Sequence, residues 1–81
     1  MTVDMAGVNG VTEGCYRVGV SFNPSGSIRI DEVKLEAARL IDDMLAIVAK
    51  GGDAARSAAL AATHIEIACM LTVKAIAYDK D

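Results

Sequence analysis

The fold of this chain is decided by the stretch Lys50-Gly51-Gly52-Asp53-Ala54. Two adjacent glycines end a helix, because glycine adopts the left-handed backbone conformation at a helix C-terminus without steric cost. The aspartate that follows is a favoured N-cap, so a second helix is expected to begin at once. Long apolar-rich segments flank the stretch on both sides. The sequence therefore predicts an all-α fold built on an antiparallel helical hairpin.

The segment before the glycines has the pattern of an amphipathic helix, and we expect Asp31 to be its N-cap. Its apolar face repeats at spacings of four, three, four and four residues, and is formed by Val33, Ala37, Leu40, Met44 and Val48. The polar side chains of this helix are expected on the solvent side; they are Lys34, Glu36, Arg39, Asp42 and Asp43.

The segment after the glycines, residues 54–78, is predicted to be a helix with apolar residues almost all the way round. A helix of this kind is buried on more than one side. A two-helix hairpin covers only one of those sides, so a second chain is needed to cover the rest. The sequence therefore predicts a homo-oligomer.

The N-terminal part of the chain gives weaker signals. Residues 1–14 are rich in Gly, Thr, Val and Asp, and we expect them to be a flexible N-terminal arm. Residues 15–81 are predicted to form a single helical-hairpin domain. A short helix is expected within residues 11–21, although Gly14 and Gly19 weaken it and leave a short strand as the alternative.

The composition restricts the partners. The chain of 81 residues has a formal net charge of −3, whereas a protein that binds long DNA or RNA carries a basic surface. A small anionic ligand needs only a few local cations and stays compatible with this charge. Residues 65–77 are apolar, but Glu66 and Lys74 interrupt them and they are shorter than the roughly 20 residues that span a bilayer. No signal peptide is visible, so we expect a soluble intracellular protein without a membrane partner.

Residues 16–26 are the strongest candidate for a binding site. A turn rich in backbone N–H groups before a helix favours anions. Tyr16 is a candidate to stack on a base, with burial in the core as its alternative role, and Arg17 is a candidate to offset phosphate charge. The candidate hydrogen-bond donors in the turn are Asn23, Ser25 and the backbone of Gly26.

Two more cations are candidates for ligand contact. Arg29 lies between the turn and the helix that follows, where it could either contact a phosphate or lie on the surface. Lys74 lies in an apolar run, where a lysine usually extends its amine to solvent or forms an interface ion pair. Contact of Lys74 with a ligand phosphate across an oligomer interface is the weaker alternative.

The sequence predicts no catalytic residue, no metal site and no cofactor. Cys15 and Cys69 are far apart and lack the spacing of a zinc site, so two reduced thiols are expected. His64 is the single histidine, and we expect it to be solvated or at an interface. No Ser/His/Asp or Cys/His pattern is legible around it.

Three blocks of this sequence are similar to a known family: Arg17-Val18-Gly19, Phe22-Asn23-Pro24-Ser25-Gly26 and Met70-Leu71-Thr72-Val73-Lys74-Ala75. They resemble the small helical-hairpin proteins of phages that include anti-CBASS protein two and share a hairpin with Thoeris anti-defence protein one. The resemblance covers about residues 16–77. The chain departs from the family pattern where Leu71 and Thr72 replace a segment that contains tryptophan.

The resemblance implies a sponge for cyclic oligonucleotides, which binds second messengers of bacterial defence without cleaving them and so blocks activation of the defence effectors. It implies a homohexamer with sites between protomers, in the cytoplasm of the infected bacterial host. Cyclic dinucleotides such as cyclic GMP-AMP are the implied ligands, with cyclic trinucleotides in a second set of sites.

Three alternatives stay open at the level of the sequence. The chain could be a structural or regulatory oligomer without a nucleotide ligand. It could be a small enzyme such as a phosphodiesterase, although the sequence has no metal-ligand spacing. The third alternative is a sponge for cyclic ADP-ribose isomers, since the resemblance extends to a hairpin shared with the Thoeris anti-defence protein.

Overall fold

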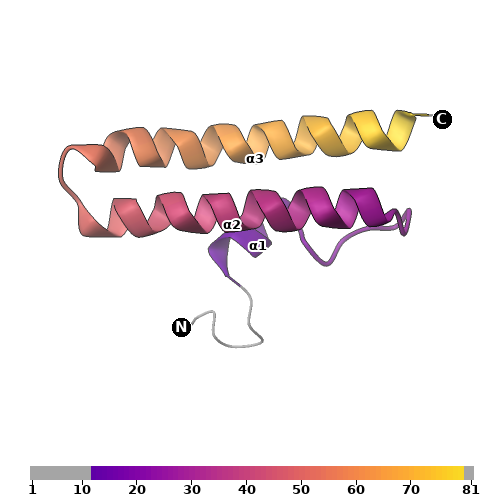
Figure 1. The fold of residues 1–81 in the computed structure, drawn as a ribbon, viewed down its shortest axis with the longest axis horizontal. Helices are drawn as coiled ribbons and strands as arrows, with labels where there is room; N and C mark the ends of the chain where they lie inside the picture. The colour runs from indigo at the N-terminus through magenta and orange to yellow at the C-terminus, as the bar shows by residue number, and fades with distance from the viewer. Residues whose placement is uncertain (1–11, 80–81) are drawn as a thin grey trace.

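The fold is all-helical across residues 12–79, which are the residues that this computed structural model describes. Helix α1 is Glu13–Val18, α2 is Ile28–Lys50 and α3 is Ala54–Tyr78. Helices α2 and α3 lie side by side and antiparallel, as predicted, and α1 packs mainly against α2 (Figure 1). The connection between α1 and α2 runs to the end of the hairpin where α2 begins and α3 ends (Figure 1). This arrangement places the predicted site residues of the turn beside the C-terminal part of α3.

The link between α2 and α3 has the predicted form. Gly51 and Gly52 have φ values of 74° and 81°, which only glycine adopts readily. Asp53 is the N-cap residue of α3, as expected, although its side chain accepts no capping hydrogen bond.

Helix α2 begins earlier than predicted. Its N-cap is Ser27, whose hydroxyl accepts a hydrogen bond of 3.4 Å from the backbone N–H of Ile30. The assignment of Asp31 as N-cap was therefore wrong. Asp31 lies one turn inside the helix, and its carboxylate accepts a hydrogen bond of 2.8 Å from the Asn23 side-chain amide.

The contact between α2 and α3 is here called the seam. Val33, Ala37 and Leu40 of the predicted face line a groove along it, but the most buried residues of α2 are others. The buried apolar residues of the seam are Ile30, Ala38, Ile41, Ala58, Ala62 and Cys69. Of the predicted face, Leu40 is 48% exposed and the other four residues are only half-buried. The prediction that Lys34 lies in solvent was wrong, because Lys34 is buried in line with Ile30 and Ala38.

Helix α1 confirms the expected short helix with narrower bounds. The Thr12 hydroxyl caps its start by accepting from Cys15 N at 3.1 Å, and Gly19 ends it at φ 65°. Of the predicted N-terminal arm, residues 1–11 lie outside the described residues, and residues 12–14 form the cap and first turn of α1. The backbone N–H of Gly14 donates to Asp42 Oδ1 at 2.8 Å, which anchors α1 on α2.

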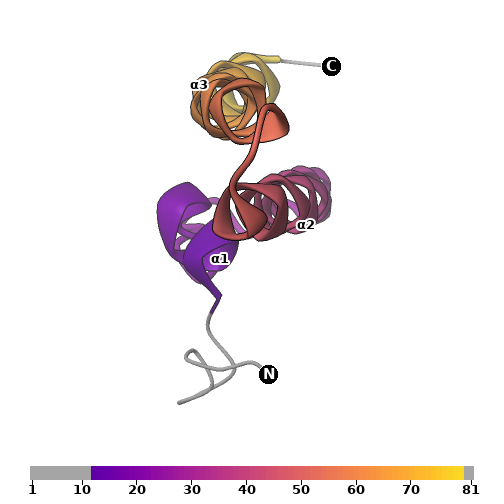
Figure 2. The same ribbon diagram turned by 90° about the vertical axis from the view of Figure 1, so that its left-hand side faces the viewer.

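The side of α3 opposite the seam is apolar and uncovered. Leu60, Ile67 and Leu71, here called the outer stripe, share one face at helical spacing and are 47–61% exposed. Viewed along the hairpin, no described element lies over this side of α3 (Figure 2). The Cα atoms extend only 12 Å along the shortest axis, so the described helices form a single layer in which α3 has α2 on one side only.

Helix α3 is also long and apolar enough, by length and composition, to cross a membrane. The sequence analysis considered only residues 65–77, and the alanine-rich first half of α3 extends the apolar stretch beyond them. One helix of this kind is weak support for a membrane span, since the helix of a soluble core has the same composition.

Candidate functional site

The turn formed by residues 22–26 is held by its own polar groups. The Asn23 side-chain amide donates to the backbone carbonyl of Ser27 and to the Asp31 carboxylate, both at 2.8 Å. The Ser25 hydroxyl donates to Asn23 Oδ1 at 2.7 Å and accepts from Ser27 N at 3.1 Å. Gly26, at φ 71°, donates its N–H to the Asn23 carbonyl. These bonds fix the turn at the start of α2, and the contact of Asn23, Ser25 and Gly26 with a ligand stays a prediction.

A small cavity of about 170 Å³ lies beneath this turn, between it and the two long helices. Val73 and Ala77 of α3 form one wall, and Ile30 and Lys34 of α2 form another. The turn contributes the rest of the lining, which consists of Phe22, Asn23, Pro24 and Ser25. The cavity is therefore bounded by residues 22–25 of the 16–26 segment that the sequence indicated as a binding site, although its walls are mostly apolar.

Lys34 is the residue of this region that the sequence analysis misplaced. Its side chain is only 6% exposed, and its ammonium donates to the backbone carbonyls of Gly19, at 3.0 Å, and of Phe22. The same nitrogen lies 5.6 Å from the centre of the Phe22 ring. A signal existed in the sequence, since Lys34 falls four residues after Ile30 and four before Ala38, in a stripe that is otherwise apolar.

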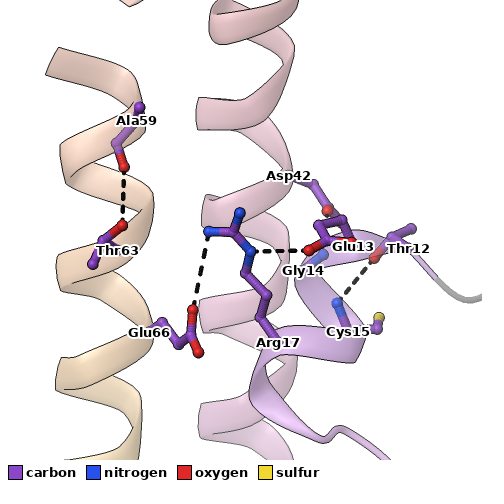
Figure 3. A network of polar contacts seen from close by, with 9 residues as sticks. All are labelled: Thr12, Glu13, Gly14, Cys15, Arg17, Asp42, Ala59, Thr63 and Glu66. Carbon is purple, nitrogen blue, oxygen red and sulfur yellow. Dashed lines mark hydrogen bonds and ion pairs between the residues drawn. The ribbon is translucent and has the colours of Figure 1, made fainter. Parts of the chain in front are cut away.

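Arg17 lies between two carboxylates, one on its own helix α1 and one on α3 (Figure 3). Its Nε donates to Glu13 Oε2 at 3.1 Å, and a terminal nitrogen lies 4.0 Å from Glu66 Oε1 on α3. The positive charge of Arg17 is therefore already shared between two carboxylates. A phosphate would have to compete with Glu13 and Glu66 for the Arg17 guanidinium. Phosphate binding at Arg17 therefore costs more free energy than the position of Arg17 in the sequence indicates.

Tyr16 and Arg29 both extend into solvent. Tyr16, on α1, is 75% exposed, which excludes burial in the core of the single chain. Arg29 pairs with Asp79 at 3.4 Å and lines a groove of about 490 Å³ between the start of α2 and the end of α3. Glu32 and Glu36 line the same groove, so its charge is not that of an anion site.

Lys74 is exposed and lies on the outer side of α3, three residues after Leu71 of the outer stripe. The structure therefore brings Asn23, Ser25 and Gly26 together in one turn, and it places Lys74 on the exposed outer side of α3. Contact of these groups with one ligand stays a prediction.

The described residues offer no metal site. Among residues 12–79, no group of three His, Cys, Asp or Glu side chains is placed to hold a metal ion. Cys15 and Cys69 are both free thiols, as predicted. Burial raises the pKa of the Cys69 thiol above its ordinary value, while the Lys34 ammonium lowers this pKa and the Glu66 carboxylate raises it. Burial thus disfavours the thiolate form of Cys69. The single histidine, His64, is exposed on α3.

Comparison with known proteins gives one match. The sequence profile of the family described as "Acb2/Tad1, hairpin domain" matches residues 16–77, which is more than half of the chain. The matched region includes every predicted site residue, from Tyr16 to Lys74. No curated protein and no solved structure matches the chain significantly.

Proposed function

Because the chain belongs to the Acb2/Tad1 hairpin-domain family, which implies an anti-defence sponge for cyclic nucleotides, we propose that it sequesters cyclic oligonucleotide second messengers. Bound messenger is kept from the bacterial defence effectors and is released unchanged. The observation that carries this proposal is the family match over residues 16–77, because it spans the turn as well as both long helices.

Cyclic dinucleotides such as cyclic GMP-AMP are the ligands that we propose first, with cyclic trinucleotides as a further class. Three features support a ligand of this kind. Tyr16 offers an exposed ring for stacking on a base. The 22–26 turn is held in one conformation before any ligand arrives, which lowers the ordering cost of binding. Lys74, in the last part of α3, is an exposed cation, and Arg29, in the first turn of α2, is a second one that a ligand phosphate would have to win from Asp79.

We propose that the site is completed by a second chain, within a homohexamer. The outer stripe of α3 supports the assembly, because Leu60, Ile67 and Leu71 are about half exposed in the single chain. The placement of Lys74 on this same side supports a site shared between protomers. We place the protein in the cytoplasm of the infected bacterium, where such messengers are made.

Cyclic ADP-ribose isomers are the second ligand class. The observation that favours them is the family description itself, which joins Acb2 and Tad1 in one hairpin domain. These isomers share the adenine base and the phosphates of the first class but differ in ring size, so the same stacking ring and cations would serve both.

The proposal is tested by titration calorimetry of the full chain against cyclic di- and trinucleotides and cyclic ADP-ribose isomers. Nanomolar binding of one class, with a fixed number of ligands per oligomer, is the expected result. An absence of binding across the panel, from protein whose oligomer is intact, would contradict the proposal and leave a structural oligomer as the better account.

A further inference from the structure

We propose that Lys34 is a positioning residue for the binding site, because its buried ammonium holds the backbone that leads into the 22–26 turn. This inference rests on the proposed function for its effect on ligand affinity. The claim that Lys34 orders the turn concerns the free protein, and it is tested without any ligand.

The ammonium of Lys34 donates hydrogen bonds to two backbone carbonyls that are three residues apart. It donates to Gly19 O at 3.0 Å and to Phe22 O. The N–H of Phe22 donates to the same Gly19 oxygen at 2.9 Å, so this oxygen accepts two bonds. Residues 19–22 therefore form a tight turn around the end of the Lys34 side chain, and the position of this turn depends on the ammonium.

The energetic balance favours a role in ordering the backbone. Burial of an ammonium is unfavourable unless hydrogen bonds compensate for its lost hydration. Within residues 12–79, no carboxylate lies within ion-pair distance of Lys34. The compensation comes instead from the two carbonyls and the face of the Phe22 ring. Hydrogen bonds to a charged group are stronger than neutral ones, so the charge stabilises one arrangement of residues 19–22.

The turn is thereby fixed at both ends. Lys34 holds the backbone on its N-terminal side, and the Asn23 amide holds the C-terminal side through Ser27 and Asp31. Between these two anchors, Pro24, Ser25 and Gly26 are exposed. A ligand that contacts this exposed part meets a turn that is already ordered, and it therefore loses less affinity to the ordering of the chain.

The test compares Lys34→Met with the wild type and with Lys50→Met, which removes an exposed lysine from the end of the same helix. Methionine keeps the length and the apolar stem of lysine but donates no hydrogen bond. Hydrogen–deuterium exchange is measured on peptides that cover residues 19–27, α2 and α3, with and without cyclic GMP-AMP or the ligand that calorimetry selects. Affinity and oligomeric state are measured on the same samples.

We expect Lys34→Met to keep its helices and its oligomer and to lose protection in residues 19–27, with ligand affinity falling roughly tenfold or more, as for the loss of a charged hydrogen bond. Saturating ligand should restore the protection, because the ligand now orders the turn. Lys50→Met should match the wild type in every measurement.

Three results would overturn the proposal. Unchanged exchange of residues 19–27 in the free variant, with or without a loss of affinity, would show that Lys34 does not order the turn. Equal loss of protection in α2, α3 and the turn would make Lys34 a residue of general stability. If Lys34→Met does not fold, Lys34→Gln is used, because its amide keeps one donor; an unfolded Lys34→Gln would also overturn the proposal.

Failure of the proposed function is distinguishable from failure of this inference. If the wild type binds none of the cyclic nucleotides, the sponge is contradicted, while the exchange of residues 19–27 in the free variants still decides whether Lys34 orders the turn.

Discussion

At the scale of single residues, Gly14 shows how tightly α1 is seated on α2. A Cβ added at Gly14 would lie 2.2 Å from the backbone carbonyl oxygen of Ala38 and 2.7 Å from Asp42 Oδ1. The backbone of Ala38 cannot move aside as the end of a flexible side chain can. The absence of a side chain at Gly14 is therefore what allows its N–H to reach Asp42.

We predict that Gly14→Ala destabilises the protein by about 1–3 kcal/mol, the range of steric overpacking, although alanine is the better helix former. Gly26→Ala is the matched comparison, since nothing lies within 4 Å of its added Cβ and only the φ of 71° is unfavourable. That strain is worth about 1–2 kcal/mol. Chemical denaturation of both variants measures the difference; a neutral or stabilised Gly14→Ala would contradict the packing described.

Tyr16 carries the residue-scale prediction for ligand binding. Tyr16→Ala should weaken cyclic-nucleotide binding by about 1–3 kcal/mol, the range for base–aromatic stacking. Because its ring is 75% exposed in the single chain, the fold should be unaffected. Tyr16→Phe keeps the ring and should bind as the wild type does. Calorimetry checks both variants, and an unchanged affinity for Tyr16→Ala in an intact oligomer would remove Tyr16 from the site.

At the scale of the elements, the two long helices begin with different caps. Ser27 accepts a hydrogen bond from Ile30 N, whereas the side chain of Asp53 makes no capping bond. Ser27→Ala should therefore cost about 1 kcal/mol of stability, as the loss of an N-cap does. Asp53→Ala should cost less than Ser27→Ala, because it loses only the attraction of its charge to the helix dipole. Thermal unfolding compares the two, and the reverse order would contradict the assigned caps.

Much of the element order could be predicted from the sequence because its signals are local. Gly51, Gly52 and Asp53 end one helix and start the next through the conformations of those residues alone. The sequence left a short strand as the alternative to the N-terminal helix, because Gly14 and Gly19 weaken a helix; in the structure Gly19 is its C-cap.

The contacts between elements could not be predicted in the same way. Gly14 and Asp42 are 28 residues apart, and Lys34 is 15 residues from Gly19. Polarity alone predicted that Lys34 lies in solvent, whereas Lys34 is buried between the packed elements. The cavity beneath the 22–26 turn depends on Val73 and Ala77 of α3, which only the tertiary structure brings there. The residues of the turn were identified from the sequence. The residues of α2 and α3 that line the cavity beside the turn were not.

At the scale of the whole molecule, the outer stripe is the feature that a single chain leaves unexplained. Leu60, Ile67 and Leu71 lie opposite the seam, and burial of one such side chain is worth about 1.5–3 kcal/mol. Association of several chains would bury many of these residues at once. We therefore propose that the homohexamer buries this surface, which the single hairpin leaves exposed.

We predict that Ile67→Glu dissociates the oligomer, because it places a charge in the centre of the outer stripe. Ser57→Glu, in the exposed first turn of α3, is the control and should leave the assembly intact. Light scattering coupled to size-exclusion chromatography measures the mass. A monomeric wild type that binds phosphatidylcholine vesicles would contradict the prediction and assign the outer stripe to a membrane.

The central claim is that this protein holds a cyclic nucleotide without altering it. The most direct measurement incubates the full chain with a small molar excess of cyclic GMP-AMP, or with the ligand that calorimetry selects, removes unbound ligand by filtration, denatures the protein and identifies the released molecule by mass spectrometry. We predict recovery of the intact ring in a fixed ratio to protein, however long the incubation. Release of a linear or cleaved nucleotide, increasing with time, would contradict a sponge and show an enzyme.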